Sequence, residues 1–146
     1  MKNTCFIPAR YESTRLPGKV LLPFKGSTVL EFLYDKCKDL EGIEKVVILT
    51  SDMPDDDAIE HTCHVNSIPV FRGSLFNVLG RFQEAAKVFC NPSDVVIRLC
   101  ADSPLIEKSL LQNFSDDITS KDHFFSTRYL QNEAFVSTTG KGNNID

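Results

Sequence analysis

The chain has 146 residues, of which 42% are hydrophobic and 25% are charged, with seven glycines and seven prolines. This composition excludes a collagen-like, low-complexity or largely disordered protein, and the length predicts a single hydrophobic core. The formal net charge of −4 argues against a DNA- or RNA-binding protein, which usually presents a broad basic face.

Short apolar runs alternate with segments of helical periodicity along most of the chain. Strands and helices are distinguished by these two periods and by the glycine, proline and capping residues between them. In chain order, the predicted elements are a strand at 4–8, a loop at 9–19, a helix from an N-cap at Ser27 to about Leu40, a strand at 46–49, a helix from Asp52 or Pro54 to about His64, a strand at 68–71, a helix at 75–89, a strand at 95–99, a helix at 105–118 and a strand at 124–127.

This alternation predicts the fold class. Strands separated by helices of 10–15 residues indicate βαβ units and a parallel sheet with helices on both faces, an α/β fold of three α/β/α layers. We expect one domain over residues 1–146. The last residues, from Thr138 to Asp146, look like a loop that stops without a closing element, so the chain resembles the N-terminal part of a longer fold.

Cysteine use and hydropathy predict the compartment. The five cysteines are odd in number and widely spaced, without a Cys-x-x-Cys pair, which favours free, mainly buried thiols in a reducing environment. A membrane span needs about 18 consecutive apolar residues, and no apolar run in the sequence approaches that length. The N-terminus also lacks the apolar core of a signal peptide. We therefore expect a cytoplasmic protein with no membrane or nucleic-acid partner.

The charges are unevenly distributed. Residues 1–25 carry five basic side chains and one acidic, whereas the remainder carries 11 basic and 19 acidic ones. The basic island contains the predicted loop at 9–19, where two arginines, a lysine and several hydroxyl residues are able to surround a polyphosphate. A solvated loop without a ligand explains the same composition.

The spacing from Ser13 to Gly18-Lys19 is close to that of a P-loop, but three features argue against one. Serine replaces the first glycine, and Val20 stands where a Mg²⁺-binding hydroxyl is needed. Pro23 also disfavours the helix that should begin there. A P-loop kinase or GTPase therefore fits poorly.

The same segment is similar to a different signature. The residues Ile7-Pro8-Ala9-Arg10 followed by Ser13 to Leu21 resemble the N-terminal motif of sugar cytidylyltransferases, a group that includes the Kdo and acylneuraminate cytidylyltransferases. The resemblance is closer to the spore-coat polysaccharide biosynthesis F-type branch. Three further segments agree with that branch, at 50–59, 70–82 and 96–106.

The resemblance implies a nucleotide-diphospho-sugar transferase-like fold and a CTP-dependent reaction. A hydroxyl of a sugar or sugar acid attacks the α-phosphorus, yielding CMP-sugar and pyrophosphate for surface polysaccharide biosynthesis. It implies that the triphosphate is held by Arg10, Ser13, Arg15 and Lys19, and that the backbone of Ala9 and Arg10 lies near the base. It also implies Mg²⁺ bound by Asp102, so that the catalytic residues are Arg10, Lys19 and Asp102.

Two arginines flank the third strand–helix connection. Arg72 is predicted to contact the nucleotide or a sugar carboxylate, although a merely exposed side chain explains it equally. Arg81 is placed to reach the same ligand groups, but an ion pair with Glu84 or Asp94 is the simpler explanation for it.

The resemblance also implies what a longer relative contains. Its C-terminal part supplies sugar contacts, a dimer-forming segment and a second metal carboxylate, whose place Asp146 takes here. We do not expect this chain to form the homodimer of the longer relatives. Two other functions stay open: a nucleotide-binding module without turnover, and a glycosyltransferase that uses a ready-made nucleotide sugar.

Overall fold

The computed structural model describes residues 2–12, 16–99 and 101, together with the backbone of two strands at 125–130 and 133–138. Contacts along the chain divide into two compact units, Met1–Leu105 and Ile106–Asp146. The single domain over residues 1–146 stays a prediction.

The first unit is built on a four-stranded sheet with the order β5-β4-β1-β6. All three neighbouring pairs are parallel. The strands are β1 (Asn3–Pro8), β4 (Ile43–Ser51), β5 (Val70–Gly73) and β6 (Val95–Arg98). The prediction of an α/β fold with a parallel sheet is therefore confirmed.

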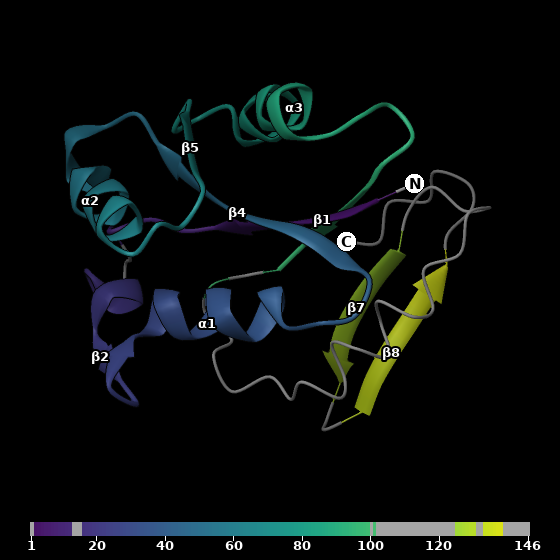
Figure 1. Cartoon of the computed structure of the whole chain (residues 1–146), viewed down its shortest axis with the longest axis horizontal. Helices are drawn as coiled ribbons and strands as arrows, with labels where there is room; N and C mark the ends of the chain where they lie inside the picture. The colour runs from purple at the N-terminus through teal and green to yellow at the C-terminus, as the bar shows by residue number, and fades with distance from the viewer. Residues whose placement is uncertain (1, 13–15, 100, 102–124, 131–132, 139–146) are drawn as a thin grey trace. The chain divides into compact units, whose positions relative to one another are not determined.

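Helices cover both faces of this sheet (Figure 1). On one face, Cys5 and Ile7 of β1 and alternate residues of β4 form a core with α1 (Val29–Lys38) and α2 (Asp57–Val65). On the other face, Phe6 and its neighbours in β4 pack against α3 (Val78–Phe89). Both faces of the central strands are apolar because neither face meets water, which gives the continuous hydrophobic runs of the sequence.

Helix α1 begins one residue later than predicted. Its N-cap is Thr28, whose hydroxyl accepts from the amide of Glu31 at 3.2 Å, while the Glu31 carboxylate accepts from the amide of Thr28 at 2.9 Å. This reciprocal capping box satisfies two amides that have no partner inside the helix. Ser27 instead belongs to a small hairpin of β2 (Pro23–Phe24) and β3 (Ser27–Thr28). The hairpin was not predicted because two-residue strands are too short to show an alternating pattern.

Other boundaries also move. Strand β4 has nine residues rather than the predicted four: residues 43–45 extend its start, where two charged side chains are exposed, and the buried Thr50 and Ser51 extend its end. Helix α2 is preceded by a 3-10 turn, η2 (Pro54–Asp56), and α3 begins at Val78, where Asn77 caps it by accepting from the Gly80 amide at 2.9 Å. The predicted helix at 105–118 lies outside the described residues.

The second unit contains an antiparallel pair, β7 (Phe125–Leu130) and β8 (Glu133–Thr138), with Arg128 opposite Phe135. The strand predicted at 124–127 overlaps β7, and β8 was not predicted. Among all residues that the structure describes, none belongs to a helix long and apolar enough to span a membrane.

Candidate functional site

The strand order creates one place where the chain reverses direction across the sheet. From β1 the chain proceeds to β4 and β5 on one side, and then returns to β6 on the other side of β1. In parallel sheets, ligands bind beyond the carboxyl ends of the strands at such a reversal. Here it lies between the loop that follows Pro8 and the residues that follow Arg98, with Leu99 held to β1 by a hydrogen bond from its amide to the Phe6 carbonyl at 3.0 Å.

The loop after β1 carries Ala9, Arg10 and Lys19. Ala9 is buried and its amide donates to the carbonyl of Leu49 at 2.8 Å, which fixes the first loop residue to β4. Arg10 is exposed, and Lys19 is half-buried at the start of the 3-10 helix η1 (Lys19–Leu21). These side chains therefore lie on one loop whose two ends are attached to the sheet and to η1.

The loop is closed at its base by Tyr11 and Gly18. The Gly18 amide donates to the carbonyl of Tyr11 at 2.7 Å. Gly18 has a φ of +71°, and a Cβ at this position would approach the Tyr11 ring to 3.1 Å. Both the backbone conformation and the close aromatic contact require glycine.

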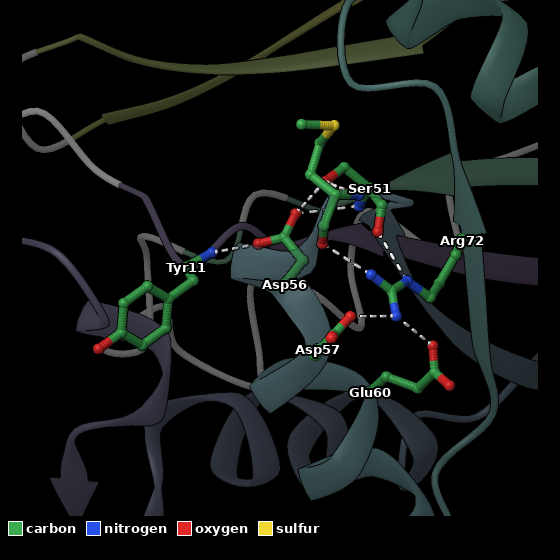
Figure 2. A network of polar contacts seen from close by, with 7 residues as sticks. Tyr11, Ser51, Asp56, Asp57, Glu60 and Arg72 are labelled. Atoms are coloured by element: carbon green, nitrogen blue, oxygen red, sulfur yellow. Dashed lines mark hydrogen bonds and ion pairs between the residues drawn. The ribbon is translucent and has the colours of Figure 1, made fainter.

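Asp56 connects this loop to the sheet and to α2 (Figure 2). Its Oδ1 accepts from the amide of Tyr11 at 2.7 Å, and its Oδ2 accepts from the amide of Ser51 at 3.1 Å and from the Ser51 hydroxyl. Asp56 is only 3% exposed. Although burial raises the pKa of a carboxyl, the hydrogen bonds from Ser51 and Tyr11 outweigh it and lower the pKa of Asp56 below its ordinary value.

Arg72 lies on the far side of the same network. Its Nε donates to the carbonyl of Ser51 at 2.8 Å and its Nη2 to the carbonyl of Met53 at 2.7 Å. Its Nη1 pairs with Asp57 at 2.7 Å and with Glu60 at 2.8 Å. All three guanidinium nitrogens thus contact residues between Ser51, at the end of β4, and Glu60, in the first turn of α2 (Figure 2). This stretch is called the β4–α2 connection, and such contacts are typical of a residue that holds backbone in place.

Arg81, in the first turn of α3, is a buried cation. It is 2% exposed, and its Nε and Nη1 atoms have no hydrogen-bond partner among the residues that the structure describes. Burial, and then the nearby charge of Arg10, lower the pKa of its guanidinium. No ion pair between Arg81 and Glu84 or Asp94 is found within the described part of the chain, so the pairing suggested by the sequence is not observed.

The structure therefore describes part of the predicted site. Ala9, Arg10 and Lys19 lie on one loop, whereas Arg72 contacts the neighbouring connection. The predicted nucleotide-binding residues Ser13 and Arg15, and the predicted metal ligands Asp102 and Asp146, lie outside the described residues.

Two charged residues at this edge are buried, which the sequence does not predict: Asp56 was not a candidate site residue, and an ion pair was the favoured explanation for Arg81. In the sequence, Asp56 looks like one of three acids in the first turn of a helix, and Arg81 looks like one charge on an amphipathic helix. No pattern in the sequence distinguishes them, because their burial depends on strands that come from other parts of the chain.

Known proteins resemble this chain over most of its length. Residues 4–140 match the cytidylyltransferase family. The chain is 38% identical over 122 residues to the spore coat polysaccharide biosynthesis protein SpsF of Bacillus subtilis, covering 81% of this chain and 48% of that protein.

Solved structures show the same fold. A cytidylyltransferase from Leptospira borgpetersenii superposes with a TM-score of 0.71 at 38% identity, covering 80% of this chain and 48% of the other. A CMP:2-keto-3-deoxy-manno-octonic acid synthetase complexed with CTP has a TM-score of 0.65 at 28% identity, with the same coverage. The chain thus spans about half the length of these relatives. The match over nearly the whole of this chain, with the fold and the loop motif that it carries, shows that the chain belongs to the cytidylyltransferase family.

Proposed function

We propose that this chain binds CTP with Mg²⁺ at the carboxyl edge of the sheet, between the loop after β1 and the residues after β6. The proposed reaction is transfer of a cytidylyl group from CTP to a hydroxyl of a sugar or sugar acid, releasing pyrophosphate. A role in surface polysaccharide biosynthesis is supported by the similarity to the spore coat protein. A cytoplasmic location stays a prediction.

The observation that carries the proposal is the position of the basic loop at the reversal of strand order. The loop that carries Arg10 and Lys19 begins at the carboxyl end of β1, and ligands of parallel α/β folds bind at this edge of the sheet. Displacement at phosphorus needs a positioned triphosphate and neutralised charge on the phosphate oxygens and on leaving pyrophosphate. A guanidinium supplies forked hydrogen-bond donors for this purpose, and an ammonium supplies a compact charge.

The remaining residues complete the proposed site. Ser13 and Arg15 would add donors to the triphosphate, and the backbone at Ala9 and Arg10 would lie beside the base. Asp102 and Asp146 would hold Mg²⁺, since this ion is usually bound by one or two carboxylates together with substrate phosphates. Bound there, Mg²⁺ would neutralise charge that develops on the phosphates.

The contacts of Arg72 favour a different role from the nucleotide contact predicted for it. Its three guanidinium nitrogens are engaged with the β4–α2 connection. We propose that Arg72 supports the site by holding this connection rather than by touching the nucleotide.

Binding is tested by thermal unfolding with CTP, UTP, ATP and GTP, each with and without Mg²⁺. A ligand at 100 times its Kd stabilises a protein by about 2.7 kcal/mol, which for this size raises the midpoint by roughly 5–15 °C. We expect the largest rise with CTP and Mg²⁺. If none of the four nucleotides raises the unfolding midpoint, the proposal is contradicted.

Turnover separates the proposed reaction from the two other functions. Pyrophosphate released from CTP only in the presence of a sugar acid such as Kdo supports cytidylyl transfer. Transfer or hydrolysis of a ready-made CMP-sugar supports a glycosyltransferase, and CTP binding without either reaction supports a binding module. Asp102→Asn should remove the Mg²⁺ dependence of CTP binding, and persistence of that dependence would show that Asp102 is not a metal ligand.

A further inference from the structure

We infer that Asp56 is a positioning residue for nucleotide binding: it fixes the base of the basic loop so that Arg10 and Lys19 meet the triphosphate in one arrangement. This inference rests on the proposed function, because it concerns how the same loop is prepared for its ligand. It is carried by the hydrogen bonds of Asp56, Tyr11 and Gly18.

Tyr11 is attached through both of its backbone groups. Its amide donates to Asp56 Oδ1 at 2.7 Å, and its carbonyl accepts from the Gly18 amide at 2.7 Å. The first bond connects the loop to the start of α2, and the second closes the loop on itself. Since Arg10 precedes Tyr11 and Lys19 follows Gly18, this pair of bonds determines where both cationic side chains begin.

The carboxylate of Asp56 does not cap helix α2, although its position at the start of that helix favours capping. Asp56 is the N-cap of α2, where an aspartate normally accepts from amides in the first turn of its own helix. Its side chain makes no such capping bond. Instead it accepts from residues 45 and 5 positions earlier in the chain, namely Tyr11 and Ser51. The helix therefore lacks a side-chain cap while the loop gains an anchor.

Further hydrogen bonds fix the Asp56 carboxylate on the side away from Tyr11. The Ser51 amide and hydroxyl both donate to Oδ2, and the Met53 amide donates to the Ser51 hydroxyl oxygen at 3.3 Å. Arg72 holds the carbonyls of Ser51 and Met53. With Asp56 at 3% exposure, water does not compete for these bonds. A rigid supporting shell of this kind keeps binding groups in their productive geometry before the ligand arrives.

A carboxylate is required because every neighbour of Asp56 in this network is a donor. An ionised carboxyl accepts at both oxygens, whereas an asparagine amide presents one acceptor and one donor. In Asp56→Asn, the NH₂ group would face either the Tyr11 amide or the Ser51 amide, and one of the two bonds would be lost. The volume of the side chain stays nearly unchanged, so the variant tests hydrogen bonding rather than packing.

The test compares Asp56→Asn with Asp55→Asn, which removes one charge from the neighbouring exposed residue of η2. Calorimetric titration with CTP and Mg²⁺ should show at least tenfold weaker binding for Asp56→Asn and less than twofold change for Asp55→Asn. Ser51→Ala removes the hydroxyl donor but leaves the carboxylate at Tyr11, so we expect a smaller loss. This variant keeps the test possible if Asp56→Asn does not fold.

Amide hydrogen exchange measured without nucleotide gives an independent result. The Tyr11 amide should exchange slowly in the unsubstituted chain and rapidly in Asp56→Asn, while the Ile48 amide, bonded to the Pro69 carbonyl at 2.9 Å in the sheet, stays protected in both. A folded Asp56→Asn that binds CTP within twofold of the unsubstituted chain would overturn the inference. An equal loss in Asp55→Asn would overturn it too, since a general charge effect would then explain the result.

Failure of the proposed function is recognised separately. If the unsubstituted chain binds no CTP, nucleotide binding is contradicted, and so is the role of Asp56 in preparing it. The exchange rates still report whether Asp56 fixes the loop. Unprotected Tyr11 in the unsubstituted chain would refute the anchor whatever the nucleotide result.

Discussion

The α-carbon of Gly18 faces the ring of Tyr11, and the same two residues share a backbone hydrogen bond of 2.7 Å. The aromatic ring therefore covers one side of the turn that precedes Lys19. This contact explains why the basic loop has a glycine at its C-terminal end, because a side chain at position 18 would press against the Tyr11 ring.

Replacing Gly18 by alanine should destabilise the fold and weaken nucleotide binding. A left-handed conformation costs a non-glycine residue roughly 1–2 kcal/mol, and the new Cβ would also meet the Tyr11 ring at 3.1 Å. Gly26→Ala is a matched control, since Gly26 has a φ of +86° and open space around it. Urea unfolding should show a larger loss of stability for Gly18→Ala, and equal losses would mean that the ring contact is unimportant.

Arg10→Ala and Lys19→Ala should each weaken CTP binding and leave the fold intact. A hydrogen bond to a charged group contributes about 1.5–3 kcal/mol, so Kd should rise roughly 10- to 100-fold. Lys87→Ala, on the exposed side of α3, is the charge-matched control. Isothermal titration gives the three dissociation constants. An unchanged affinity in both loop variants would rule out this loop as the triphosphate site.

Asp56 should make stability depend on pH at the acid end. Because its folded pKa is lowered, its contribution is complete above the pKa of an unfolded aspartate, about 3.9. The contribution is lost as the pH falls from there through the folded pKa. The difference in urea midpoint between the unsubstituted chain and Asp56→Asn should therefore be large at pH 7 and shrink below pH 4. A difference that is constant from pH 3 to pH 7 would contradict this assignment.

Arg81→Met should raise the free energy of unfolding. The side chain is buried, and within the described part of the chain two of its nitrogens lack hydrogen-bond partners. Each unsatisfied buried polar group costs about 1–3 kcal/mol. Methionine keeps the length of the side chain and needs no hydrogen bonds. Lys87→Met on the same helix serves as the control, with an expected change within about 0.5 kcal/mol. Destabilisation by Arg81→Met would show that the charge is compensated in the folded chain.

Much of the fold could be predicted because its signals are local. The apolar run at 46–49 predicts a strand that is buried on both faces, and the apolar stripe after Thr28 predicts a helix with one buried face. The alternation of strand and helix patterns predicts a parallel sheet. Boundaries are harder to predict: Ser27 and Thr28 are both good N-cap residues, and the capping box between Thr28 and Glu31 makes Thr28 the N-cap.

Contiguous residues are enough to reveal the basic loop, its glycine and lysine, and the family signature from Ile7 to Leu21, because the chemistry of such a segment is recognisable without its neighbours in space. The folded chain is needed to show that β6 lies beside β1, that Asp56 accepts from Tyr11, and that Arg72 holds the β4–α2 connection. These relationships join residues far apart in the chain. They follow from how strands and helices pack into one core, and short-range periodicity contains no record of that packing.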